Sequence, residues 1–245
     1  MLAFRKGLKS SLVRCLHFAN EVYCRMKAII VSDLHLGFRF SLSQQFKRFL
    51  ENLPEGYDLI LNGDLVHMQG NKLTQSDQQI LGIIREESFN REVVWVRGNH
   101  DSDFRMPNPG KIIFRQIHTI GKHLLIIHGD VFDKFWGRNQ AIVKIVYFID
   151  AIWTKLGGKE VNLARLARNF EIFNIFRRNL MRNAVKLAKT NGCAAVTCGH
   201  THYSEDTVIH GIRYINTGSW TEWPPPYLLV NNQEIVLKTP DNPTN

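Results

Sequence analysis

The sequence predicts a single α/β domain built as a sandwich, and three observations support this fold class. The chain has 245 residues, of which 44% are hydrophobic and 22% charged, a composition typical of one globular domain with a large core. After residue 26, short β-like runs alternate with helical patterns, which is the order found in α/β folds. Clusters of Asp, Asn and His follow five of the expected strands. This composition excludes a disordered chain, a collagen-like repeat and a disulfide-rich scaffold.

The expected elements follow one another regularly along the chain. The first strand covers 27–32, where the run Ala28-Ile29-Ile30-Val31 is continuously apolar. A helix follows, because its apolar residues recur at helical spacing: Leu42, Phe46, Phe49, Leu50 and Leu53. The later elements are strand 57–62, helix 74–88, strand 92–97, strands 111–119 and 122–128, helices 134–156 and 160–190, strand 193–198, and β segments to about 239 that are interrupted at Pro224-Pro225-Pro226.

Two segments stand apart from this alternation. Residues 1–25 form a basic extension ahead of a domain at 26–245, with five Lys/Arg and one Asp/Glu. We interpret the extension as an irregular or helical tail, or as an amphipathic helix on a membrane surface. The other segment is a helical insertion at about 134–190. From Lys134 to Lys189 it holds twelve Lys/Arg and three Asp/Glu, so its net charge equals the +9 of the whole chain.

The net charge favours an anionic partner, which would be nucleic acid, a phosphorylated substrate or an anionic membrane surface. The insertion mixes arginines with aromatic and aliphatic residues. We expect it to contact lipid, to pack on the sandwich or on a second subunit, or to bind nucleic acid. Four scattered cysteines do not form a disulfide framework and fit a reduced cytosolic compartment. No apolar stretch reaches the roughly 18 residues that a membrane span needs.

The polar clusters lie directly after the expected strands. They are Asp33-Leu34-His35, Asn62-Gly63-Asp64, Gly98-Asn99-His100-Asp101, His128-Gly129-Asp130 and Gly199-His200-Thr201-His202. Sites in open α/β sheets form at the carboxyl ends of strands. Imidazole and carboxylate together suit manganese, iron or zinc. The five blocks together therefore predict a metal site. Two such ions, about 3.5–4 Å apart, can clamp a phosphoryl oxygen and generate a hydroxide.

The other histidines lack this context and are expected in the core or on the surface: His17, His67, His118, His123 and His210. Among them His67 deserves notice, because it follows Asp64 within reach of one turn.

The five blocks resemble those of the calcineurin-like metallophosphoesterase superfamily, and the resemblance spans residues 27 to about 220. It implies a two-sheet α/β/β/α metallophosphoesterase sandwich with a dinuclear centre between the sheets and with the helical insertion as a lid. It also implies two cation sites that share Asp64. One would be held by Asp33, His35, Asp64 and His202, and the other by Asp64, Asn99, His128 and His200.

The same resemblance implies the catalytic roles. A hydroxide bridging the two metals would attack phosphorus, and His100 would act as general acid or transition-state stabiliser. Asp101 would orient His100 by accepting its ring proton. We expect manganese first, although zinc, iron, cobalt and nickel suit the same ligands.

A narrower resemblance is to the UDP-2,3-diacylglucosamine hydrolases of lipid A biosynthesis. It rests on the Asp-Leu-His-Leu run at 33–36, on Val131-Phe132-Asp133 after the fourth block, on the basic insertion and on residues 216–220. Those enzymes are peripheral membrane proteins that cleave a pyrophosphate, usually with Mn(II). The resemblance implies a lipid-linked phosphorylated substrate and a cytoplasmic location at the inner face of the membrane. His100 stands where those hydrolases commonly have arginine. The alternative is a metallophosphoesterase acting on nucleotides, nucleic acid or phosphoprotein.

Overall fold

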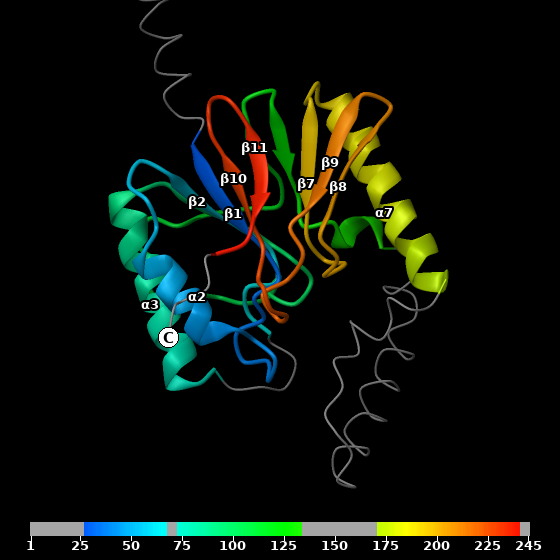
Figure 1. The fold of residues 1–245 in the computed structure, drawn as a ribbon. Helices are drawn as coiled ribbons and strands as arrows, with labels where there is room; N and C mark the ends of the chain where they lie inside the picture. The colour runs from blue at the N-terminus through cyan, green and yellow to red at the C-terminus, as the bar shows by residue number, and fades with distance from the viewer. Residues whose placement is uncertain (1–26, 68–72, 134–170, 241–245) are drawn as a thin grey trace, which may run out of the picture.

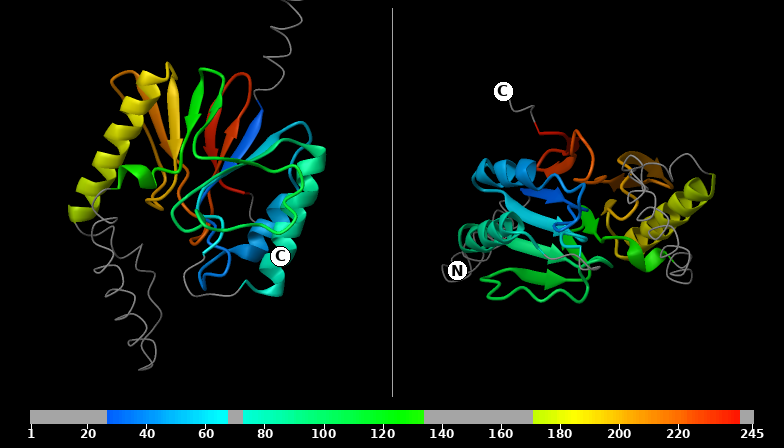
Figure 2. Two further views of the ribbon diagram at one scale, coloured as in Figure 1. Left: turned by 180° about the vertical axis from the view of Figure 1, so that it is seen from behind. Right: turned by 90° about the horizontal axis from the view of Figure 1, so that it is seen from below.

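The computed structural model describes residues 27–67, 73–133 and 171–240. Its elements form four layers in the order α/β/β/α. Figure 1 shows α2 and α3 at one side, the two sheets between, and α7 at the other side, and Figure 2 shows the same layers from behind and from below. This arrangement confirms the predicted fold class. The expectations for 1–25, for helix 134–156 and for the first part of helix 160–190 fall outside the described residues.

The two sheets contain six and five strands. The first sheet has the order β11-β10-β1-β2-β3-β4 and the second the order β5-β6-β7-β9-β8. The strands of the first sheet are β1 (Ala28–Val31), β2 (Asp58–Asn62), β3 (Val93–Val96), β4 (Ile113–Arg115), β10 (Tyr227–Val230) and β11 (Ile235–Lys238). Those of the second are β5 (His118–Ile120), β6 (Leu124–Ile126), β7 (Ala195–Cys198), β8 (Glu205–Ile209) and β9 (Ile212–Asn216).

Helices cover the outer face of each sheet. The first sheet carries α2 (Ser43–Glu51) and α3 (Gln75–Asn90), and the second carries α7 (Glu171–Thr190). Because side chains alternate along a strand, each strand supplies two cores. In β1, Ile30 faces the other sheet and Val31 faces the helices. The domain therefore has one core between the sheets and one beneath the helices on each side.

The direction of the parallel strands determines where the five polar clusters lie. β1, β2, β3 and β4 run parallel in the first sheet, and β6, β7 and β9 run parallel in the second. Their carboxyl ends therefore lie at one edge in each sheet. The loops that follow β1, β2, β3, β6 and β7 carry all five polar clusters.

The predicted strand at 111–119 is wrong as a single element. The structure divides it into β4, which pairs with β3 in the first sheet, and β5, which pairs with β6 in the second. The chain thus crosses from one sheet to the other at residues 116–117. β propensity reports how well a residue fits a pleated surface and does not specify the partner strand, so the sequence gives no signal for this crossing.

The described part of the insertion packs on the sandwich. On α7, one face is buried against the second sheet and contains Leu180, Ala184, Val185 and Ala188. Packing on the sandwich was one of the expectations for the insertion, and the structure shows it for this face of α7. No helix in the described parts of the chain is long and apolar enough to span a membrane.

Candidate metal centre

Six of the predicted site residues come together as two groups of potential ligands. Asp33, His35 and His202 form the first trio, and Asp64, His128 and His200 form the second. Within each trio, one ligand atom of every residue lies within 4.8 Å of the others. Both trios combine residues that follow strands of the first sheet with residues that follow strands of the second.

In the first trio, the ring nitrogens converge on one carboxylate. His202 Nε2 lies 3.3 Å from Asp33 Oδ1, and His35 Nε2 lies 3.9 Å from the same oxygen. The two Nε2 atoms are 3.0 Å apart. Asp33 and His35 are buried, so these groups meet where water gives little screening.

Asp64 stands between the two trios. Its Oδ2 lies 3.1 Å from His128 Nε2 in the second trio and 3.9 Å from His35 Nε2 in the first. Its Oδ1 accepts a hydrogen bond of 2.8 Å from the backbone N–H of His100. One carboxylate therefore reaches both groups and the loop that carries His100.

The backbone bends sharply at these positions. Five site residues have left-handed φ angles between 52° and 68°: Asp33, His35, Asp64, His200 and His202. This region is unfavourable for residues other than glycine, and it persists where the surroundings enforce it. Backbone bonds do so here, because Asp33 N–H donates to Gly63 O at 3.1 Å and His35 N–H donates to Asp64 O at 2.9 Å.

Two glycines make the close approach of the loops feasible. A Cβ at Gly98 would lie 2.3 Å from Asp64 Oδ1, and a Cβ at Gly199 would lie 2.2 Å from Asp33 Oδ2. Any larger residue would push a carboxylate out of its trio. These glycines are needed for the space they leave.

The carboxylates are held in their charged form. Burial alone would raise the pKa of Asp64, but the neighbouring His128 lowers it well below its ordinary value. At Asp33, burial likewise raises the pKa, but the neighbouring His128 and His202 lower it below its ordinary value. The pKa of His128 moves well above its ordinary value, because Asp64 and Asp33 outweigh the effect of burial.

The geometry of His128 shows that the second trio suits a cation. His128 Nδ1 lies 2.9 Å from the carbonyl oxygen of Asn62, which can only accept, so Nδ1 carries the ring proton of a neutral imidazole. Nε2 is then an acceptor, and it faces the acceptor Oδ2 of Asp64 at 3.1 Å. Two acceptors do not bind each other, so this contact requires a positive charge, either a ring proton or a metal ion. Carboxylate and imidazole are suitable ligands for a divalent metal.

The structure adds Asp133 to the site. His200 Nε2 lies 3.1 Å from Asp133 Oδ2, an arrangement in which a carboxylate fixes the tautomer of an imidazole and leaves the other nitrogen for a ligand. Asp133 follows η1, the 3₁₀ turn at Asp130–Phe132. The sequence analysis named Asp133 only within the run Val131-Phe132-Asp133, which supported the narrower family resemblance, and assigned it no role in the site.

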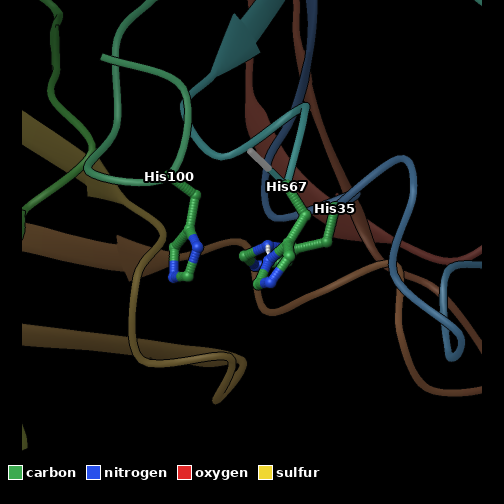
Figure 3. A group of neighbouring side chains, drawn as sticks. All are labelled: His35, His67 and His100. Atoms are coloured by element: carbon green, nitrogen blue, oxygen red, sulfur yellow. Dashed lines mark hydrogen bonds between the residues drawn. The ribbon is translucent and has the colours of Figure 1, made fainter. Parts of the chain in front are cut away.

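His67 also lies in the site. Its ring lies beside those of His35 and His100, as Figure 3 shows. The centroid of the His67 ring is 4.6 Å from that of His100, with 23° between the planes. Burial lowers the pKa of His67 to about 4 and also lowers those of His35 and His100.

The expected contact between Asp101 and the ring of His100 is absent. The Asp101 carboxylate instead accepts three hydrogen bonds of 2.8–2.9 Å, from Leu65 N–H, Trp95 Nε1–H and Gly98 N–H. These donors occupy both of its oxygens. The structure therefore shows Asp101 fastening the loop after β3 to its neighbours, and a role for Asp101 in orienting His100 stays a prediction.

Asn99 precedes His100, whose backbone N–H donates to Asp64, and its place as a ligand of the second ion stays a prediction. Its side chain is exposed, and no hydrogen bond among the described residues joins it to a site carboxylate. His100 Nδ1 is buried and has no hydrogen-bond partner in the same parts of the chain, so the ring is available to a ligand.

The sequence model described as calcineurin-like phosphoesterase matches residues 26–204. No curated protein matches the chain.

Similar solved structures include the YfcE phosphoesterase of E. coli, with 18% identity over 87% of this chain and 99% of that chain and a TM-score of 0.43. An archaeal phosphodiesterase has 16% identity over 87% and 99% and a TM-score of 0.43. Vps29 of Chaetomium thermophilum has 13% identity over 86% of each chain and a TM-score of 0.47. The family match includes every loop that carries a trio and spans well over half of the sequence, so the chain belongs to the calcineurin-like phosphoesterase family.

Proposed function

We propose that this chain cleaves a phosphodiester or pyrophosphate bond in a lipid-linked substrate of the UDP-2,3-diacylglucosamine type. Family membership makes the chain a metal-dependent phosphoester hydrolase. It implies divalent ions, and the trios offer groups that could hold them. The bond, the substrate and the roles of single residues are the proposal.

The observation that carries the proposal is the position of Asp64 between the trios. In the proposed centre, Asp33, His35 and His202 hold one ion, His128 and His200 hold the other, and Asp64 contributes to both. When bound, the two ions supply charge neutralisation and an activated water. We assign manganese to both positions, and Asn99 remains a proposed ligand of the second.

The chain's own residues then position the substrate. His100 lies beside His35 and Asp64, and its Nδ1 has no hydrogen-bond partner in the described part of the chain. We therefore assign it to the phosphoryl group, where its ring donates a hydrogen bond to an oxygen that gains charge. The backbone N–H of His100 donates to Asp64, which fixes the distance between that ring and the bridging carboxylate. Asp101 supports this placement by fastening the loop.

The lipid part of the proposal draws support from α7. Phe176 on this helix packs edge-on against His200, with centroids 5.8 Å apart. A groove of about 580 Å³ lies farther along the helix. It is lined by Arg177, Arg178, Met181, Arg182, Val185, Ile209 and His210. Guanidinium groups beside apolar side chains suit an anionic amphiphile at a membrane surface, which accords with a peripheral location at the inner face of the membrane.

The first experiment compares two substrates with Mn(II). We expect the purified protein to release UMP from UDP-2,3-diacylglucosamine and also to hydrolyse bis-p-nitrophenyl phosphate. Hydrolysis of only the chromogenic diester would contradict the lipid assignment and favour a nucleotide, nucleic-acid or phosphoprotein substrate. The variant His100→Arg introduces the residue that the UDP-2,3-diacylglucosamine hydrolases commonly have at this position. It tests whether residue 100 determines which of the two substrates is cleaved.

A second experiment tests the membrane. Arg177 pairs with Glu205, so its replacement would disturb the fold, whereas Arg178 is half exposed. We expect Arg178→Glu together with Arg182→Glu to weaken binding to vesicles that contain anionic phospholipid. The matched control is Lys47→Glu together with Arg48→Glu on α2, which covers the opposite sheet and loses the same amount of positive charge. Equal binding by all three proteins would contradict the membrane proposal.

A further inference from the structure

His67 is buried in the candidate centre, yet none of the roles proposed above uses it. Its side chain is 6% exposed. Its backbone N–H donates to Leu36 O at 2.9 Å, and Val66 pairs with Leu36. The segment that carries His67 is therefore bonded to the loop that carries His35, and the two rings are held at a fixed spacing (Figure 3).

The contact between the two rings determines where their protons lie. His35 Nε2 faces Asp33, Asp64 and His202, so this nitrogen is the ligand atom in the proposed centre. A neutral imidazole has one proton, which then sits on Nδ1 of His35. That atom lies 3.4 Å from Nδ1 of His67. His67 therefore accepts the bond through Nδ1, and its own proton sits on Nε2.

The ring of His67 makes a second set of contacts. It is nearly parallel to the ring of His100, at 4.6 Å and 23°. It also contacts Phe38, whose ring centroid lies 5.2 Å away at 31°. These contacts restrict how the His100 ring can turn. Because His100 Nδ1 has no hydrogen-bond partner among the described residues, the stack with His67 stands in for the orienting carboxylate that was expected at Asp101.

We infer that His67 is a positioning residue with two separate tasks: it fixes the tautomer of His35 through Nδ1, and it fixes the plane of His100 through its ring. The inference rests on the proposed function, since it assumes that His35 is a ligand and that His100 meets the substrate. A metal-binding histidine commonly donates its second N–H to an oxygen acceptor. Here an imidazole takes that place.

Two substitutions separate the two tasks. His67→Asn keeps an acceptor near the position of Nδ1 but removes the ring. His67→Phe keeps a ring that can stack but removes the acceptor. The matched controls are His123→Asn and His123→Phe, because His123 is an exposed histidine outside the trios. Thermal melts establish that each variant is folded.

The readouts are Mn(II) affinity by calorimetry and kcat and KM for bis-p-nitrophenyl phosphate. We expect His67→Phe to bind Mn(II) about 10–100-fold more weakly, the effect typical of losing a partner of a ligating histidine. We expect His67→Asn to bind Mn(II) within about threefold of wild type, since its acceptor remains, and to lose kcat with little change in KM. Both controls should match wild type.

Wild-type Mn(II) affinity in a folded His67→Phe protein would overturn the first task, and wild-type kcat in His67→Asn would overturn the second. Asp64→Ala distinguishes these failures from a failure of the proposed function. If Asp64→Ala removes binding and turnover while the His67 variants match wild type, only the inference about His67 fails. If Asp64→Ala also matches wild type, the proposed centre itself is wrong.

Discussion

The two trios have the same kinds of ligand but differ in what holds the far side of their imidazoles. In the second trio, His128 donates to the Asn62 carbonyl and His200 contacts the Asp133 carboxylate. In the first trio, the Nδ1 of His35 faces another imidazole, that of His67. Acceptors of this kind raise the basicity of a ligating histidine, and the 3.4 Å contact between the imidazoles is longer than the 2.9 Å and 3.1 Å contacts to oxygen in the second trio. The second trio should therefore bind a cation more tightly, and the first should exchange it more readily.

The largest loss of activity is expected at Asp64, because its carboxylate reaches both trios. We expect Asp64→Ala to lower kcat by about 10³-fold or more, because groups that act as a unit fail together. The measurement is turnover of bis-p-nitrophenyl phosphate with Mn(II). Asp206→Ala is the control, since Asp206 is a carboxylate paired with Arg213 away from the site. Comparable losses in the two variants would show that Asp64 has no special role.

Asp133→Asn should remove much of the difference in Mn(II) affinity between the two trios. The amide is neutral and supports His200 less strongly, so we expect the tighter of the two Mn(II) affinities to weaken by about 10–100-fold. In a calorimetric titration, wild type should show two binding phases, and the variant should show them merged. Two unchanged phases would mean that the asymmetry has another origin.

The metal-free protein should reveal the same asymmetry through pH. The pKa of Asp64 is lowered in the fold, so its contribution to stability is present above its unfolded pKa of 3.8 and is lost in more acidic solution. The pKa of His128 is raised, so its contribution is complete below 6.5 and is lost as pH rises through the higher folded value. After chelation, urea unfolding should therefore show stability falling on the alkaline side.

His128→Gln is the variant that sharpens this test. It removes the titrating group of the second trio, so the alkaline decline should shrink. An identical decline in His128→Gln would assign it to groups elsewhere in the chain.

The smallest effect concerns Cys198, the last residue of β7, whose side chain packs between the second sheet and α7. Burial raises the pKa of the Cys198 thiol far above its ordinary value, and the side chain is fully buried. Because the thiolate is the reactive form, we expect no alkylation of Cys198 at pH 8 in the folded protein and full alkylation in urea. Mass spectrometry of the labelled peptide provides the measurement. Labelling of Cys198 before unfolding would show that the sheet carrying the second trio opens locally.

Much of the site follows from the sequence because each ligand block is local. A polar run after an apolar strand specifies which strand end carries the group, and parallel strands bring those ends together. This logic places Asp33, His35, Asp64, His128, His200 and His202 in one region. Whether each is a ligand stays a prediction that the metal titrations test.

The partners of these residues could not be predicted in the same way, because each comes from a separate segment. Asp133 is close to His128 in sequence but contacts His200 from the loop after β7. The donors to Asp101 include Trp95, a residue inside a strand. The crossing between β4 and β5 depends on which strands are adjacent in the two sheets. Such contacts are set by tertiary packing, which local patterns do not record.

Each trio contains residues from both sheets, and this has a mechanical consequence. In the second trio, Asp64 follows β2 of the first sheet, whereas His128 and His200 follow β6 and β7 of the second. An ion held there cross-links the two halves of the sandwich, so prying the sheets apart must release it. By reciprocity, any ligand that wedges between the loops and spreads the sheets must lower the affinity for the ion. The affinity of the centre for its ion should therefore depend on the spacing between the two sheets.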